Sequence, residues 1–216
     1  MKSVSEIAPF IALVSESEAH ESETEKALSL ISSKPVGNSL LKAINESSTS
    51  DKFITIISSS KANSSALGHL TDSQLTKYKV PSSTNPLRWA TDKAAEISTH
   101  ERLGGAGEGV SVNIYWNKDQ AIKINLKQQS VVVNRPAGHS PHALDDAFLS
   151  LAHELVHAFY LLNGKRLSTP LDSRGTRIHE ELRAVGVPPF ENAMFSENAI
   201  RREHHKDYRR DYYTIN

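Results

Sequence analysis

The longest apolar stretch of the chain runs from Ala147 to Leu162 and predicts a buried helix. It contains no proline and no glycine, and its one charged residue is Glu154. Asn163-Gly164 predicts the C-terminal end of this helix. Its start is open between two readings, because Ser140-Pro141 fits an N-cap with a first helical residue and Asp145-Asp146 would begin the helix later.

Upstream of this helix, apolar and polar residues alternate with the period of a β-strand. The alternation is clear in Val110–Trp116 and Ala121–Leu126, and Val131–Val133 fits a third strand. We therefore expect a small antiparallel sheet followed directly by the helix. An exposed edge, at residues 110–116 or 121–126, could hold an extended peptide by strand addition. An ordinary core sheet is an equally good interpretation.

The N-terminal half gives weaker signals. Helical spacing of apolar residues predicts helices over Ser22–Ser32 and Ser39–Ile44, and Trp89–Ile97 fits another. Phe53–Ile57 predicts a short buried strand, whereas the first 18 residues are expected to be irregular. The pattern assigns nothing to most of residues 58–90. Residues 103–109 are rich in glycine but match neither a phosphate loop nor a dinucleotide fingerprint, so a mobile loop is expected.

Composition narrows the classes of function. The formal net charge is +0, which argues against broad electrostatic binding of nucleic acid. No apolar run is long enough to predict a transmembrane helix, so no membrane partner is expected. The chain has no cysteine, so any metal site must use histidine and carboxylate ligands.

Serine is concentrated at the start of the chain. Of 28 serines, 21 lie in the first 100 residues. A flexible, serine-rich start suits a segment that an export machine reads without cleaving it, and a simple surface loop fits the composition equally well. We therefore divide the chain into an export segment, residues 1–18, and one folded domain, residues 19–216.

The candidate chemistry lies inside the apolar helix, in the motif His153-Glu154-Leu155-Val156-His157. Histidines four residues apart lie on the same face of a helix, so both imidazoles can bind one metal ion. The glutamate after the first histidine is then placed to act as a general base toward water. The alternative is that both histidines are ordinary core residues and that the glutamate has no chemical role.

Two histidines need a third protein ligand. A third histidine spaced as in HExxHxxGxxH is excluded, because Tyr160 and Asn163 occupy the glycine and histidine positions. The best candidates are the adjacent carboxylates Glu180 and Glu181, only one of which can point at the metal, since neighbouring helical residues diverge by about 100°. We expect Glu180 to be the ligand and Glu181 to support a histidine ligand. The weaker alternatives are Asp172 and His179, and both glutamates could simply face solvent.

The C-terminal segment mixes both charges at helical spacing, which is usually a solvated face. Arg209 and Tyr212 are nevertheless spaced to lie together. A positioned arginine or tyrosine stabilises the negative charge that develops on a peptide carbonyl during hydrolysis. These two residues are therefore candidates for that role, and His204 and His205 are expected to be structural or exposed.

The sequence resembles the NleD-like zinc metallopeptidase effectors that bacteria deliver through type III secretion. The resemblance rests on AHELVHA at Ala152–Ala158, EELRAVG at Glu180–Gly186 and SENAIRREH at Ser196–His204. The motifs are also similar to the active site of clostridial neurotoxin light chains. That similarity implies Glu180 as the third zinc ligand, and Arg209 with Tyr212 as the pair that assists the reaction.

The resemblance implies a function as well as a site. It implies cleavage of host mitogen-activated protein kinases, of the JNK and p38 type, in the activation loop, after secretion into the host cytoplasm. We accordingly expect a monomeric, single-domain α+β zincin in which His153, His157 and Glu180 hold Zn²⁺. Two alternatives stay open: a metal-stabilised module that blocks a host partner without catalysis, and a bacterial peptidase that acts on its own cell's proteins.

Overall fold

The computed structural model describes residues 1–61, 64–79, 85–99, 107–119, 146–167 and 175–209. Within them, five strands form one sheet in the order β1–β2–β3–β5–β4. Strands β2, β3 and β5 are parallel, and β1 and β4 are antiparallel to their neighbours. The expected α+β class is confirmed, although the sheet is mixed where an antiparallel one was expected. The strands are β1 Lys2–Val4, β2 Ile11–Ser15, β3 Ile54–Ser58, β4 Ser65–His69 and β5 Ser111–Trp116.

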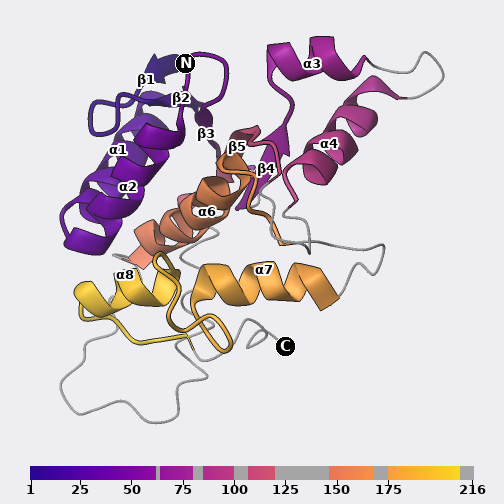
Figure 1. Ribbon diagram of the computed structural model, residues 1–216. Helices are drawn as coiled ribbons and strands as arrows, with labels where there is room; N and C mark the ends of the chain where they lie inside the picture. Colours follow the sequence, from indigo (N-terminus) through magenta and orange to yellow (C-terminus); the bar gives the residue numbers. More distant parts are fainter. Residues whose placement is uncertain (62–63, 80–84, 100–106, 120–145, 168–174, 210–216) are drawn as a thin grey trace.

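The helices build two layers over the sheet (Figure 1). Helices α1 and α6 pack on the sheet, α4 packs on β4, and α2 packs on α1 and α6. Helices α7 and α8 pack on α6 and form the outer part of the helical side. Of the helices described, none is both long and apolar enough to cross a membrane. The helices are α1 Glu18–Ser32, α2 Pro35–Ser47, α3 Asp72–Tyr78, α4 Pro86–Ile97, α6 Ala147–Leu162, α7 Gly175–Val185 and α8 Glu197–Glu203.

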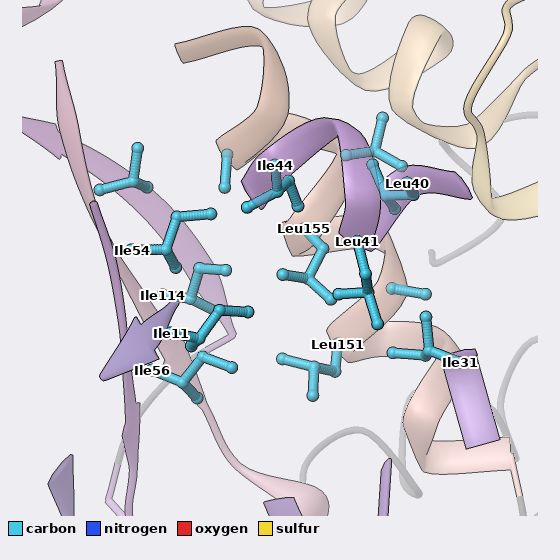
Figure 2. Packing of buried hydrophobic residues seen from close by; sticks show 14 of the residues in the cluster. Ile11, Ile31, Leu40, Leu41, Ile44, Ile54, Ile56, Ile114, Leu151 and Leu155 are labelled. Atoms are coloured by element: carbon cyan, nitrogen blue, oxygen red, sulfur yellow. The ribbon is translucent and has the colours of Figure 1, made fainter. Parts of the chain in front are cut away.

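The hydrophobic core lies between the sheet and the first helical layer. Figure 2 shows isoleucines of β2, β3 and β5 facing leucines of α2 and α6. Every second residue of β2 and β3 is buried, which is the period of a strand with one covered face. Leu151 and Leu155 of α6 are fully buried at the centre of this contact. The sheet therefore fixes the position of α6.

The start of the chain is regular, so the expected irregular segment is wrong for residues 1–18. Strand β1 pairs with β2, and β2 is parallel to β3 through the crossover that α1 and α2 make. Ile11 and Leu13 are buried in the core. The sequence offers only a short apolar run at residues 10–14, and pairing with β1 and β3 makes it a strand. An export role for these residues stays a prediction.

The strands of the sheet differ from the expected ones in two ways. Strand β4 and helix α3 lie in residues 58–90, where the pattern assigned nothing. Strand β5 pairs with both β3 and β4, so it offers no free edge to a peptide. In the described sheet the antiparallel edge beyond β5 is β4. The expected strands at 121–126 and 131–133 lie outside the described residues.

Helix α6 has the predicted bounds. Its N-cap is Asp146, in agreement with the later of the two expected starts, and Ser140-Pro141 lies outside the described residues. At the other end Asn163 is the C-cap, and Gly164 has a φ of 59°. This left-handed conformation costs glycine little and explains why the helix stops there.

The end of the glycine-rich segment packs tightly against the C-terminus of α6. The Gly107 amide donates to the Gly164 carbonyl oxygen at 2.7 Å, and the Val110 amide donates to the Leu161 carbonyl oxygen at 3.2 Å. A Cβ atom on Gly109 would lie 1.9 Å from the Leu162 carbonyl oxygen. The requirement for glycine at this position is therefore close backbone approach. Residues 103–106 of the expected loop lie outside the described residues, and its mobility stays a prediction.

The packing predicts a large difference between two leucine substitutions. Leu151→Ala removes a side chain that is 0% exposed, and we expect the free energy of unfolding to fall by about 2–5 kcal/mol. Leu87→Ala is the control, because Leu87 is 82% exposed, and its effect should stay within roughly 0.5 kcal/mol. Chemical denaturation measures both. Equal costs for the two substitutions would contradict the placement of α6 on the sheet.

Candidate metal centre and active site

Helix α6 places His153 and His157 one above the other, as their spacing requires. The two ring centroids are 4.8 Å apart, and the rings meet edge to face at 76°. The Nε2 atoms of the two rings are 3.1 Å apart. Both imidazoles therefore present the same nitrogen to one point on the side of α6 that faces α7.

Helix α7 brings a carboxylate to this point. Glu181 Oε2 lies 3.0 Å from His153 Nε2 and 3.2 Å from His157 Nε2. These three residues form the one group in the described part of the chain whose ligand atoms are close enough to hold a metal ion. The cluster is mostly sheltered from solvent, since the three side chains are between 10% and 16% exposed.

The three atoms fit a metal ion in number, type and spacing. Two imidazole nitrogens and one carboxylate oxygen are a known donor set of catalytic zinc sites. Ligand atoms about 2.0–2.1 Å from a tetrahedral zinc ion lie roughly 3.3–3.4 Å from one another, which is close to the spacing observed here. Three such ligands also leave the fourth position to a water or a substrate.

Glu180 lies beside the cluster, but its carboxylate is turned toward the protein. Arg183 donates to both carboxylate oxygens, at 2.7 and 2.8 Å, and the Leu167 amide donates to Oε1. The closest approach to the histidine cluster is 3.9 Å, to His157 Nδ1. In the structure it is Glu181, and not the expected Glu180, that lies at the histidines, and Glu180 is held by Arg183 instead of supporting a histidine. The physical reason is the divergence of neighbouring helical residues. Which of the two binds a metal stays a prediction.

The Glu180–Arg183 pair anchors α7. Arg183 also donates to the Lys165 carbonyl oxygen at 3.0 Å, and its guanidinium stacks 3.5 Å from the centre of the Tyr160 ring. Both charges are buried, so each satisfies the other. This pair holds α7 against the segment after α6 and so determines where Glu181 points.

Helix α8 contributes a carboxylate that the sequence analysis did not identify. Glu197 is 2% exposed, and its Oε2 lies 3.1 Å from His153 Nδ1. Arg201 and Arg209 donate to the same carboxylate, each at 2.7 Å. The sequence shows the Glu197 and Arg201 spacing of i and i+4, which predicts a pair on one helix. Nothing in it shows that this pair lies against His153.

The carboxylate of Glu197 lies between Arg209 and the histidine cluster. Its NH1 donates to Glu197, and its backbone amide donates to Asn198 Oδ1 at 2.9 Å. The other residue of the expected pair, Tyr212, lies outside the described residues, as does Asp172. His179 is exposed, and its ring lies 6.2 Å from that of Phe190.

The two C-terminal histidines lie away from the metal cluster. His204 packs on Phe148, with the ring centroids 4.8 Å apart, and His205 is exposed. These positions agree with the structural or exposed roles expected for them.

Burial and charge shift the pKa values of the cluster in opposite directions. Burial alone lowers the pKa of His153, but hydrogen bonds with Glu181 and Glu197 raise it to about 10. Burial raises the pKa of Glu181, and its two histidine partners more than offset this and lower it. Two arginines likewise hold the pKa of Glu197 well below its usual range, against the effect of burial. The protein thus holds positive charge between carboxylates that stay ionised, an environment suited to a cation.

Glu154 is in a different environment from the other carboxylates. It is 7% exposed, and burial raises its pKa, against the attraction of the neighbouring histidines. A carboxylate whose pKa is raised by burial is a stronger base and is suited to taking and returning a proton. The site therefore combines a triad that could hold a metal ion with a separate buried carboxylate.

The chain matches a family of peptidases described as effector proteins, over residues 10–212. Comparison with curated proteins and with solved structures gives no match. The family match spans strands β2 to β5 and the helices that form the site, and it confirms the resemblance to NleD-like effectors. Effectors are secreted into a host and act on a host protein. The chain belongs to the M91 peptidase family of effector proteins.

Proposed function

We propose that this protein is a zinc-dependent endopeptidase with His153, His157 and Glu181 as metal ligands and Glu154 as the general base. The observation that carries the proposal is that three atoms converge on one point beside α6, namely His153 Nε2, His157 Nε2 and Glu181 Oε2. Helix α6 also carries Glu154. The reaction is hydrolysis of a peptide bond in a host protein, as membership of a peptidase effector family supports.

Zinc bound at the triad would supply a Lewis acid that polarises the scissile carbonyl and acidifies a water molecule. Glu154 removes a proton from the attacking water and returns one to the leaving amine. Its buried environment favours this exchange, because burial raises the pKa of Glu154 and so makes its carboxylate a stronger base toward the proton of water. The attacking oxygen ends in the new carboxyl group, and the amine leaves with the proton.

Negative charge on the carbonyl oxygen needs a positive partner in this site. Arg209 is the proposed partner, since its guanidinium already lies at Glu197, on the far side of His153 Nδ1. Tyr212 is proposed to assist it by analogy with the Arg-x-x-Tyr pair of the neurotoxin light chains. An arginine held by a buried carboxylate is fixed in place, which is what stabilisation of a developing charge requires.

The proposed substrates are mitogen-activated protein kinases of the JNK and p38 type, cleaved in the activation loop, and the proposed delivery route is type III secretion into the host cytoplasm. The sequence resemblance to NleD-like effectors supports these assignments. Strand β4 is the proposed docking edge for the extended substrate segment, since it lies at the edge of the described sheet and packs on α6.

Loss of Glu154 should stop catalysis without removing the metal. We expect Glu154→Gln to lower the rate of kinase cleavage by about 10²–10⁴-fold, because the amide cannot take up the proton. Glu191→Gln makes the same chemical change on an exposed side chain and should cleave like the wild type. Intact-mass spectrometry of JNK- and p38-type kinases after incubation measures the products, with chelator-treated enzyme as a second control.

The kinase experiment separates the chemistry from the substrate. One cleavage in the activation loop, absent with Glu154→Gln and with chelator, is the expected result. Full activity of a clean Glu154→Gln preparation would contradict the proposed mechanism. Intact kinases after incubation with folded, zinc-loaded wild type would remove the substrate assignment, and terminal proteomics of host lysate would then identify the cleaved proteins.

Neighbouring glutamates provide a matched pair for the third ligand. We expect Glu181→Gln to weaken zinc binding strongly, because a neutral amide replaces an anionic ligand at both histidines. Glu180→Gln should retain zinc and lose stability instead, since it leaves the buried charge of Arg183 without its partner. Chelator competition measures zinc affinity, and urea denaturation measures stability. The opposite pattern would restore Glu180 as the ligand.

A further inference from the structure

Glu197 makes more contacts than its own charge requires. Its carboxylate is 2% exposed and receives Arg201 at Oε1 and Arg209 at Oε2, each at 2.7 Å. A buried carboxylate needs a compensating charge, and two guanidinium groups already supply it. The contact of Oε2 with His153 Nδ1 at 3.1 Å is therefore an addition that charge balance does not explain.

That contact determines what the His153 ring can do. An ionised carboxylate only accepts hydrogen bonds, so Nδ1 must carry the proton that it donates to Glu197. In a neutral imidazole the other nitrogen, Nε2, then has a free lone pair. Nε2 is the atom that faces His157 and Glu181. The contact thus selects the ring form in which the metal-facing nitrogen can bind a metal.

Neither Glu180 nor Glu197 accepts a hydrogen bond from Nδ1 of the second histidine, His157. Glu180 Oε2 is 3.9 Å from His157 Nδ1, which is too long for a hydrogen bond. Glu180 is also committed to Arg183. The carboxylate of α8 therefore acts on His153 specifically.

Helix α8 is held firmly enough to position a side chain. Glu203, at its end, accepts hydrogen bonds from the amides of Val36 and Gly37 at 2.6 and 2.9 Å, and so caps the N-terminus of α2. Asn198 and Arg209 bond to each other through side chain and backbone in both directions, at 2.8 and 2.9 Å. Figure 1 shows α8 against the end of α2 and beside α6.

We propose that Glu197 is a positioning residue of the metal centre, which accepts a hydrogen bond from His153 Nδ1 and thereby holds Nε2 toward the metal. This inference rests on the proposed function. Carboxylates that orient a metal-binding histidine in this way typically contribute 10–100-fold to metal affinity or activity. Glu197 reaches the metal-facing nitrogens only by its contact with His153, so its effect on zinc affinity passes through that ring. It also holds Arg209, and zinc affinity, not cleavage, is therefore the readout that isolates the positioning role.

The test uses Glu197→Gln in the full chain, with zinc affinity as the readout. Arg201 donates twice to the Oε1 side, so the amide oxygen of the variant belongs there. The amide nitrogen then faces His153 Nδ1 and donates to it, which moves the ring proton to Nε2. We expect zinc to bind roughly 10–100-fold more weakly in a competition with a chelator.

Glu203→Gln is the matched control. It makes the same change on the same helix and weakens an anchor of α8, but Glu203 contacts the amides of α2 and not a histidine. We expect lower stability in urea with a zinc affinity close to that of the wild type. If both variants lose zinc affinity in proportion to their lost stability, Glu197 is merely structural and the proposal is overturned.

A measurement on the wild type keeps the proposal testable even if Glu197→Gln does not fold. Long-range proton–nitrogen NMR spectra of the zinc-loaded, histidine-labelled protein identify which ring nitrogens carry protons. We expect Nδ1 of His153 to be protonated and Nε2 to bind the metal; binding through Nδ1 overturns the proposal.

The outcomes also separate this inference from the proposed function. A wild type that binds no zinc overturns both. Zinc binding with cleavage that depends on Glu154, combined with unchanged zinc affinity in folded Glu197→Gln, overturns the positioning role alone.

Discussion

Helix α6 carries polar side chains into a layer that is otherwise apolar, and the packing of the C-terminal half follows from this. His153 and Glu154 are less than a tenth exposed. Polar groups at such depth are costly unless they are paired, and water does not reach them freely. Partners must come from other elements, and α7 and α8 supply them as the carboxylates of Glu181 and Glu197. The contacts that shape the candidate site thus also pair polar groups that would otherwise be buried without partners.

The ends of α6 are fixed by charges from distant parts of the chain. Lys52 donates to the Leu162 carbonyl oxygen at 2.9 Å, where a cation also stabilises the negative end of the helix dipole. Lys206 pairs with Asp146 at 2.5 Å, at the other end of the helix. With the sheet below and these ties at both ends, α6 has little freedom to move. A helix held in this way presents two histidines in constant geometry, which a metal centre requires.

Carboxylates of one residue type have different roles here because their surroundings differ. Glu180 is bound by a guanidinium and a backbone amide and anchors a helix. Glu181, the next residue, lies at two imidazoles, and Glu197 joins a histidine to two arginines. Glu154 takes part in none of these contacts with guanidinium or amide groups, and burial raises its pKa. The roles proposed for these four glutamates, namely ligand, anchor, orienting group and base, therefore follow from their neighbours and not from residue type.

Local patterns were sufficient wherever one element decides the outcome. The bounds of α6 follow from an apolar run that ends at Asn163-Gly164, and the shared face of His153 and His157 follows from helical spacing alone. Strand β5 follows from alternation, and β3 from a short apolar run, although neither pattern gives the partner strand. Even the family was visible in short motifs of the C-terminal half.

What the sequence left open depends on contacts between elements far apart in the chain. Strand β2 becomes a strand only beside β3, and the parallel order needs the crossover through α1 and α2. The choice between Glu180 and Glu181 depends on the rotation of α7, which the Arg183 contacts determine. Glu197 reaches His153 across 44 residues, because α8 packs on α6. Sequence spacing encodes one helix face at a time, whereas a site built from three helices depends on how those faces meet in the folded protein.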